Sequence, residues 1–369
     1  MDFIFSPEQD ELRTAVRSVL SDAVSAGVVR SAVDGDLAAT GEEARALWRR
    51  IVDLGWHAVL AAEAHGGLGL GLVDAVVVLE ELGRVTAPGP YLSSAVSATL
   101  AARELGLDEL SEALAAGERT ATVALEESGH GDPVEQVRTH AARKGATWRL
   151  HGTKPIVFDA DVADVVVVAA RTPDGLATFL LEDPQVVGVP MLDPTRRAGR
   201  LELDGVVAER VGPIDDHTPA WRRVADATAV ALAAELVGVS EAALAMATAY
   251  ADERVQFDVP LSSHQVIQHK LVDMLHGLEL GRVGVHHAAW AFDAGDEHAA
   301  RSAAIAKASM AEAAIRVTGD NIQIHGAAGF TWQSDAHVLF KRAKQNDLLF
   351  GYQGWQRRRV ADSLLPPVP

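Results

Sequence analysis

The sequence predicts a mostly helical protein with a β domain in the middle of the chain. Apolar residues recur at helical spacing from residue 6 to about 117, and long helical patterns return from residue 217 to 362. Between these zones, short runs of β-branched and apolar residues are separated by turn residues, which is typical of strands. We therefore expect three domains, at residues 1–117, 118–216 and 217–369, in the order helices, β domain, helices.

The first domain opens with a helix-start signal. Ser6 precedes Pro7, and the acidic Glu8 and Asp10 follow within one turn, so we expect Ser6 to cap a helix whose first residue is Pro7. A glycine-rich stretch at 66–71 has the composition of a phosphate loop. No strand pattern precedes it and no Lys-Ser/Thr pair follows it, so we predict a turn between helices instead.

The middle domain is predicted from strand-length apolar runs. Gly145, Pro184 and the sequence Pro173-Asp174-Gly175 mark turns between these runs, and no long helical pattern intervenes. A compact antiparallel β domain is therefore expected. The predicted strands include Thr120–Leu125, Val165–Ala169 and Ala177–Leu181.

The last domain is predicted to consist of long helices. The Ala-rich stretch Ala229–Ala251 is interrupted by Glu235 and Glu241, so we expect a buried core helix and no membrane span. Ser262 and Gln265 have the spacing of a capping box, which predicts the start of the next helix. Residues 303–317 are poor in large side chains, which allows helices to pack closely.

The composition of the chain limits which binding partners and which cellular compartment we expect. The formal net charge is −18, which repels nucleic acid and anionic lipid, so we expect neither as a partner and no membrane insertion. Cysteine is absent, which excludes disulfides, thiolate metal sites and a cysteine nucleophile. The histidines are scattered, and we predict no metal site. The acidic N-terminus lacks the apolar core of a secretory signal, and a cytoplasmic location is expected.

Residues 321–361 carry a family resemblance. The run Gln323-x-x-Gly326-Ala327-x-Gly329, followed by Arg342-Ala343-Lys344, resembles the C-terminal region of the acyl-CoA dehydrogenases. The opening residues 1–13 and the segment 79–94 are also typical of that family. The resemblance implies a helical N-domain, a small antiparallel β barrel and a C-terminal four-helix bundle that builds tetramers. It also implies FAD and an acyl-CoA substrate oxidised at its α,β bond.

The catalytic base of that family is missing from both of its known positions. Alignment on Arg342-Ala343-Lys344 places Phe350 where the family has the glutamate of Tyr-Glu-Gly-Thr. Some members carry the base early in the first C-terminal helix, and there this chain has Thr228-Ala229. Neither a phenyl ring nor these two residues can remove the α proton of a thioester. The resemblance therefore implies that this chain contributes no catalytic residue.

The residues that hold the flavin ring in the family are also replaced. Glu126 stands at the flavin-binding threonine of Thr-Glu-Pro-Gly, within the stretch Glu126–Asp132. In the second motif, Lys-x-Trp-Ile-Thr-Asn, Ile156 replaces the tryptophan and Phe158 replaces the threonine. A carboxylate at position 126 is expected to repel the electron-rich edge of a reduced flavin. The resemblance thus implies a damaged ring site in this chain.

A second set of family positions, which contacts the FAD of a neighbouring subunit, is retained. The family pattern Arg-x-x-Phe is matched at 254–257, and His-Gln is matched at 264–265. Each position also has a purely structural explanation. Arg254 could form a surface ion pair with Glu253 or Asp252, Gln265 could serve just to cap a helix, and Gly326 and Gly329 could serve just to end one. The predicted cofactor-binding residues are Arg254, Gln256, Phe257, Gln265, Gln323, Gly326, Ala327 and Gly329.

This asymmetry predicts a division of labour between two unlike chains. The pattern resembles the base-lacking subunit of actinobacterial heteromeric (α2β2) acyl-CoA dehydrogenases that act on bulky thioesters such as steroid side chains. The implied partners are a second acyl-CoA dehydrogenase-like chain that shares FAD, an acyl-CoA and electron-transfer flavoprotein. Two alternatives stay open at this point. One is a complete enzyme whose base has moved to Asp347 or Glu235, and the other is a redox-inactive scaffold.

Overall fold

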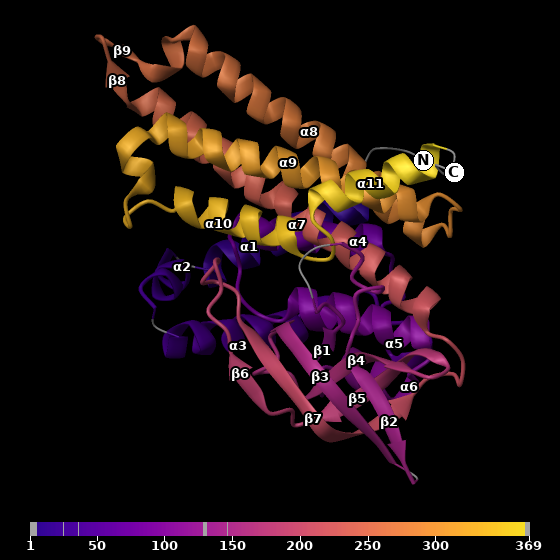
Figure 1. The fold of residues 1–369 in the computed structure, drawn as a ribbon. Coiled ribbons are helices and arrows are strands. Elements are labelled where there is room, and N and C mark those ends of the chain that lie inside the picture. The colour runs from indigo at the N-terminus through magenta and orange to yellow at the C-terminus, as the bar shows by residue number, and fades with distance from the viewer. Residues whose placement is uncertain (1–5, 25, 36, 128–130, 146, 366–369) are drawn as a thin grey trace.

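The fold stacks a β barrel, a layer of N-terminal helices and a C-terminal bundle of long helices (Figure 1). The computed structural model describes residues 6–24, 26–35, 37–127, 131–145 and 147–365. Within these residues the helices run to Ala115, the barrel strands lie between Ala121 and Val211, and helices resume at Thr218. Residues 1–5 of the family-like opening lie outside the described part.

The N-terminal layer begins as predicted. Ser6 caps α1: its hydroxyl accepts a hydrogen bond from the Gln9 N–H at 3.3 Å, and the Gln9 side chain accepts one from the Ser6 N–H at 3.1 Å. The glycine-rich stretch 66–71 forms the turn before α4, as expected. The layer comprises α1 (Pro7–Ala23), α2 (Ala26–Val33), α3 (Leu37–Asp53), η1 (Trp56–Ala58), η2 (Glu63–His65), α4 (Leu72–Arg84), the π-helical segment η3 (Tyr91–Ala98), α5 (Thr99–Leu105) and α6 (Asp108–Ala115).

The middle strands close into a barrel. Hydrogen-bonded pairs run in the ring β4–β2–β3–β7–β5 and back to β4, while β1 pairs with β4 and β6 with β7. The expected antiparallel pairing is found throughout except at β4, where β1 and the end of β2 run parallel to it. The strands are β1 (Ala121–Ala124), β2 (His140–Lys144), β3 (Thr147–Phe158), β4 (Val165–Thr172), β5 (Gly175–Glu182), β6 (Val186–Gly188) and β7 (Ala198–Val211).

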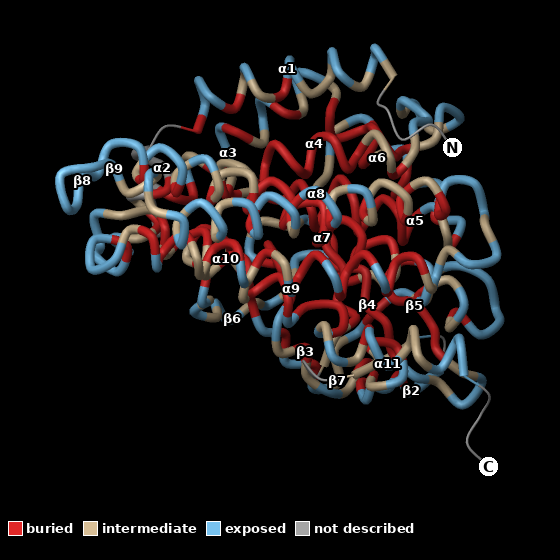
Figure 2. Tube along the Cα trace, turned by 90° about the horizontal axis from the view of Figure 1, so that it is seen from above, coloured by how far each residue is buried: buried red, intermediate tan, exposed pale blue. Residues whose placement is uncertain are grey.

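Helix α7 is the centre of the bundle (Figure 2). It is long and apolar enough to cross a membrane by length and composition, but 72% of its most apolar window is buried inside the protein, as in a core helix. The C-terminal elements are α7 (Thr218–Glu253), β8 (Val255–Gln256), β9 (Val259–Pro260), η4 (Leu261–Ser263), α8 (Gln265–Asp293), α9 (Ala299–His325), η5 (Gly326–Phe330), α10 (Ala336–Leu348) and α11 (Gln353–Leu364).

Glycine lets α7 lie directly against α4. A Cβ added at Gly238 of α7 would come within 1.8 Å of the Glu80 carbonyl oxygen, and one at Gly83 of α4 within 2.1 Å of the Glu235 carbonyl oxygen. Contacts this short are impossible for a side chain, so both positions require glycine. One continuous core therefore runs through the N-terminal helices and the bundle, whereas the barrel interior also holds a core of its own.

The predicted capping box at Ser262 is wrong. Helix α8 does begin at Gln265, but its N-cap is His264, which makes no side-chain cap bond, and Leu261–Ser263 form the short 3-10 segment η4. Ser262 lies within η4, two residues before that N-cap, so its hydroxyl is not placed to cap α8. The only polar link of Ser262 to α8 in the described structure is its carbonyl, which accepts from Gln268 Nε2 at 2.9 Å.

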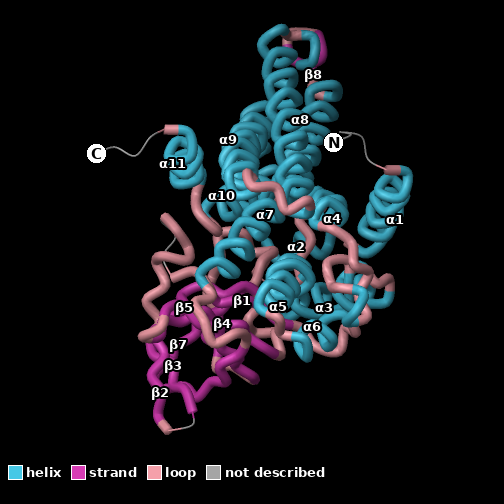
Figure 3. Tube along the Cα trace, turned by 90° about the vertical axis from the view of Figure 1, so that its right-hand side faces the viewer, coloured by secondary structure: helices cyan, strands magenta, loops and turns pink. Residues whose placement is uncertain are grey.

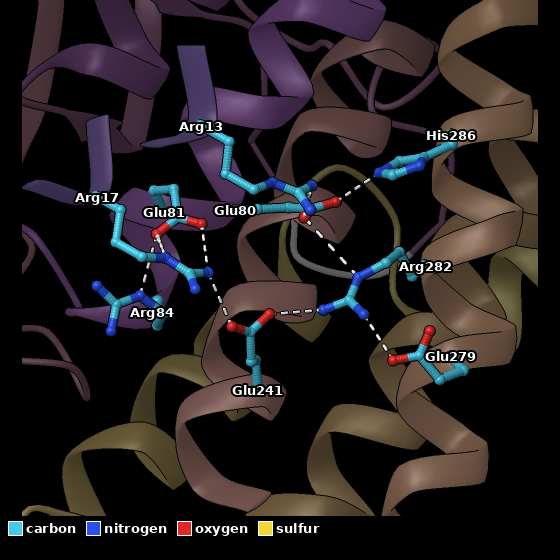
Figure 4. A network of polar contacts seen from close by, with 9 residues as sticks. All are labelled: Arg13, Arg17, Glu80, Glu81, Arg84, Glu241, Glu279, Arg282 and His286. Atoms are coloured by element: carbon cyan, nitrogen blue, oxygen red, sulfur yellow. Dashed lines mark hydrogen bonds and ion pairs between the residues drawn. The ribbon is translucent and has the colours of Figure 1, made fainter. Parts of the chain in front are cut away.

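An ionic network ties α1 to the rest of the helices (Figure 4). The buried Glu80 carboxylate contacts Arg13 at 2.8 Å and His286 at 2.6 Å, from α1 and α8. Glu81 accepts from both Arg17 and Arg84, and the same network extends to Glu241, Glu279 and Arg282. Because the carboxylates of α4 are buried and multiply paired, this network fixes α1 on the outer face of the bundle.

Candidate functional site

The family's reactive positions meet in one small pocket where barrel, N-terminal helices and bundle join. Its free volume is about 20 Å³, room for little more than a water molecule. A three-ring isoalloxazine does not fit this space with the side chains as they lie. The lining residues are Leu92, Ser93 and Ser97 of η3, Thr122, Val123 and Glu126 on or next to β1, Ile156 and Phe158 of β3, Thr228 of α7, and Phe350 after α10.

Both base positions are occupied by groups that cannot accept a proton from carbon. The Phe350 side chain is buried and lines the pocket. Thr228 is fully buried, and its hydroxyl donates to Ser97 Oγ at 3.2 Å, while Ala229 is also buried. The structure thus brings together the replaced positions that the sequence singled out, and no carboxylate stands at either base position.

Glu126 is the one carboxyl group among the described residues that line this pocket. Burial raises the pKa of Glu126 to about 7, although the backbone N–H groups of Phe350 and Gly351 and the Lys307 ammonium act to lower it. At neutral pH the group is therefore about half protonated, so simple charge repulsion of a flavin is only part of its effect. Residues 128–130 of the same predicted motif lie outside the described residues.

Neither proposed substitute base is available at the pocket. Glu235 is buried in an ion pair with Arg196, and its carboxylate also accepts from Asn346 Nδ2 at 2.8 Å. Asp347 accepts from the backbone N–H of Gln353 at 3.1 Å, at the start of α11. Neither residue lines the pocket. These carboxylates fix the packing of the bundle.

The predicted cofactor-binding residues lie on the β8–β9 hairpin and on the ends of α7, α8 and α9 next to it, which Figure 1 shows at the far end of the bundle. Arg254 ends α7, Gln265 opens α8, and Gln323 lies in the last turn of α9, just before η5. The rings of Tyr250 and His325 stack at 4.2 Å and hold the ends of α7 and α9 together. Four segments of the chain are thereby brought to one surface.

The side chains at this surface are exposed. Arg254 makes no ion pair with Asp252, Glu253 or any other described residue, so the surface-pair alternative finds no contact in the structure. Gln256, Gln265 and Gln323 are exposed too. The Phe257 ring is 87% exposed, which leaves a large apolar surface in water. An unpaired guanidinium beside exposed amides and an aromatic ring suits a nucleotide with a pyrophosphate.

The backbone of this surface has its own constraints. Phe257 and Asp258 form the two-residue turn of the hairpin, with φ of +56° and +65°. Asp tolerates this left-handed region, so the loss of the family glycine at 258 keeps the loop shape, whereas Phe does so at a cost. Gly326 ends α9 with φ +61°, and a Cβ at Gly329 would come within 2.9 Å of the Ile322 carbonyl oxygen. Ala327 is not among the residues of positive φ.

Comparison with known proteins identifies the family to which this fold belongs. The model "Acyl-CoA dehydrogenase, N-terminal domain" matches residues 6–118, and "Acyl-CoA dehydrogenase, C-terminal domain" matches residues 222–365. The acyl-CoA dehydrogenase FadE27 of Mycobacterium tuberculosis is 35% identical over 340 residues, which cover 87% of this chain and 88% of that protein. The chain belongs to the acyl-CoA dehydrogenase family. Its predicted family and fold class are thereby confirmed.

Other acyl-CoA dehydrogenases also match this chain over most of its length. The acyl-CoA dehydrogenase IpdE2 of Mycolicibacterium smegmatis is 30% identical over 96% of this chain and 98% of its own length. The structure of a variant of the Tcur3481-Tcur3483 steroid ACAD superposes with a TM-score of 0.87 at 32% identity, covering 97% of both chains. The ChsE4-ChsE5 complex from Mycobacterium tuberculosis superposes with a TM-score of 0.88 at 30% identity, over the full length of both chains. These relatives support the predicted resemblance to the actinobacterial heteromeric type.

Some residues of the site were not anticipated from the sequence. Ser93 and Ser97 line the pocket from η3, where the chain forms a π-helix, and π-helical turns are frequent at functional sites. A run of small polar residues after Pro90 was the available signal. Gln356 was also missed: its amide donates to the Phe350 carbonyl at 3.0 Å. In the described part of the chain, no group of three or more potential ligands could hold a metal ion.

Proposed function

We propose that this chain is the non-catalytic partner subunit of a heteromeric FAD-dependent acyl-CoA dehydrogenase. The observation that carries the proposal is the contrast between its two half-sites. The pocket at the family's reactive positions is lined by Phe350, Phe158 and Ile156, leaves about 20 Å³ free and lacks a base. The surface around Arg254, at the other end of the bundle, is exposed and carries an unpaired guanidinium. The first half-site is unsuited to a flavin ring, and the second is suited to a flavin's pyrophosphate.

The two half-sites have different tasks in this proposal. Bound flavin supplies the acceptor for the hydride that leaves the acyl chain. Arg254 binds the pyrophosphate, Gln265 and Gln323 donate or accept hydrogen bonds beside it, and the bare backbone from Gly326 to Gly329 lies along the nucleotide. The partner chain supplies the ring site and the base that removes the α proton. This chain therefore binds and orients, and the proton leaves the substrate through the partner.

The bundle offers a surface for that partner. Helix α8 exposes a row of large apolar side chains, including Val272 at 63%, Leu280 at 62% and Val283 at 48% exposed. Leu280 and Val283 also line a shallow groove of about 350 Å³ with Ile305 of α9. An apolar face of this kind is costly in water, and we assign it to a second acyl-CoA dehydrogenase-like chain in an α2β2 assembly.

The relatives support a proposal for the substrate class. A solved relative carries the name steroid ACAD, which favours a bulky acyl-CoA such as a steroid side-chain thioester. Electron-transfer flavoprotein is the expected acceptor, and the cytoplasm the expected location. A complete enzyme with a moved base is disfavoured because Glu235 and Asp347 are engaged elsewhere, and because a pocket of about 20 Å³ has no room for a thioester.

The test is the flavin content of the complex with and without Arg254. Arg254→Ala removes a charge-assisted contact of about 1.5–3 kcal/mol, which corresponds to a roughly tenfold to hundredfold loss of flavin affinity. The co-expressed complex should lose flavin on gel filtration, and added FAD should restore flavin and activity together. Arg254→Lys should rescue only in part, because an ammonium lacks the planar fork of donors.

The matched control is Arg200→Ala, which removes an exposed arginine of the barrel that pairs only with Glu202 among the described residues. It should leave flavin content unchanged. Equal flavin content in Arg254→Ala and wild type, with the complex still assembled, would overturn the proposal. The colour of the purified chain separates the alternatives: yellow protein from this chain alone favours a complete enzyme, and a colourless complex favours a scaffold.

A further inference from the structure

Glu126 and Phe350 join three layers of the molecule at the filled pocket. Glu126 follows β1 of the barrel, and Phe350 follows α10 of the bundle, 224 residues later in the chain. The Phe350 N–H donates to Glu126 Oε1 at 2.9 Å. Around them lie Ser93 and Ser97 of the N-terminal layer. Figure 3 shows the strands of the barrel below the long helices of the bundle. Protein atoms therefore fill the junction between barrel and bundle.

The loop that carries Phe350 is held in an unfavourable conformation. Phe350 has φ +50°, in the left-handed region that a bulky residue rarely adopts, and Gly351 follows with φ +85°. A Cβ at Gly351 would come within 2.2 Å of the Trp355 ring, so this position requires glycine. Two hydrogen bonds fix the strained residue: its N–H donates to Glu126, and its carbonyl accepts from Gln356 Nε2 at 3.0 Å. The surroundings thus specify a buried position for the Phe350 ring.

The groups around Glu126 favour this arrangement over an open site. Among the described residues, Lys307 of α9 is the one charged side chain that acts on it, and Lys307 itself is fully buried and donates to the carbonyls of Asn346 at 2.6 Å and Asp347 at 3.0 Å. The pocket residues from η3, β3 and α7 carry no charge. Glu126 therefore finds its direct hydrogen-bond donor in the Phe350 loop, and opening the loop would leave this partly buried carboxyl group without that donor.

We propose that Glu126 and Phe350 form an internal plug that fills this chain's own reactive site and holds the barrel against the bundle without a cofactor. In this chain, contacts between protein atoms take the place that a bound ligand would occupy between barrel and bundle. Given the proposed function, it also predicts that the assembly holds one flavin per pair of unlike chains, on the partner's ring site. The plug itself does not depend on the partner and can be tested separately.

The first measurement is the flavin count of the co-expressed complex, from flavin absorbance and protein concentration. We expect one FAD per pair of chains in the wild type, and the same count in Glu126→Ala and in Phe350→Leu. A count of two in the wild type, or a loss of flavin in either variant, would overturn the plug, because this chain's own site would then hold a cofactor. Arg254→Ala should lower the count from one towards zero, so the two proposals fail by different outcomes.

The second measurement is amide hydrogen exchange in the same complex. In Glu126→Ala the Phe350 amide loses its acceptor, and its exchange should become about tenfold faster, together with that of the pocket end of β3. Glu126→Gln retains a carbonyl acceptor of the same length and should keep the protection. Glu182→Ala, an exposed position on the barrel, is the control and should change nothing at Phe350. Wild-type protection of Phe350 in Glu126→Ala would refute the plug even if the flavin count is one.

Discussion

Raising the pH from 5 to 8 should destabilise this protein through Glu126, and the size of the effect follows from its surroundings. Burial raises the pKa of this carboxyl from 4.5 to about 7. Because the folded-state pKa is the higher one, the protonated group stabilises the fold fully below pH 4.5, and this stabilisation is lost as the pH rises towards 7. Between pH 5 and 8 the loss amounts to roughly 2–3 kcal/mol.

The assay compares wild type with Glu126→Gln, whose side chain has nearly the same shape and does not titrate. The difference in free energy of unfolding between the two proteins cancels the titrating groups that do not interact with Glu126; Lys307 is not among them, because burial lowers its pKa and Glu126 acts to raise it. Measured by urea denaturation, the advantage of Glu126→Gln should grow by roughly 2–3 kcal/mol from pH 5 to 8. The exposed Glu182→Gln serves as the control and should give a flat difference. A flat difference for Glu126→Gln would show that its carboxyl is hydrated, and the reasoning about the filled pocket would fail.

Two further predictions concern the bundle. Arg342→Ala leaves the buried Asp193 without its ion-pair partner and should lower the free energy of unfolding by about 3–5 kcal/mol. Adding Asp193→Asn should recover part of this loss. If Arg342→Ala unfolds in urea at the same midpoint as the wild type, the prediction is contradicted. Leu280→Arg places a charge on the exposed apolar face of α8 and should reduce the molar mass of the complex in light scattering, whereas Asp174→Arg on a barrel turn should not. A full-size complex with Leu280→Arg would remove α8 from the interface.

The sequence predicted those elements whose signals are local. Ser6 and Pro7 start α1 as expected, because a cap, its acceptor and the first turn lie within a few residues. The strand runs around Val165 and Ala177 are confirmed, since β-branched residues and turn signals stand side by side in the chain. The capping prediction at Ser262 failed because Pro260 and the short segment η4 determine the backbone conformation just before α8. The spacing of Ser262 and Gln265 alone does not indicate that conformation.

The site was predictable only as a set of replaced positions. Motif spacing placed Phe350 and Glu126 at family positions without indicating that they bond to each other. Their hydrogen bond joins residues 224 apart in sequence and depends on how the barrel docks on the bundle. The raised pKa of Glu126 is likewise a property of the folded surroundings. Sequence reasoning therefore treated Glu126 as a charge that repels flavin, whereas the structure makes it an acceptor that fastens the Phe350 loop.

The two half-sites together argue against simple decay of an enzyme. Random loss of function would affect both ends of the bundle alike, and it would leave a cavity where the base and the ring contacts were removed. Here the reactive pocket is lined by large side chains, leaves about 20 Å³ free and is crossed by a long-range hydrogen bond, while the surface around Arg254 retains an unpaired guanidinium and a strained, exposed Phe257. Strain and exposed apolar area both cost stability. Features that destabilise the single chain are retained at the surface that faces outward, which is what a subunit that completes another chain's site requires.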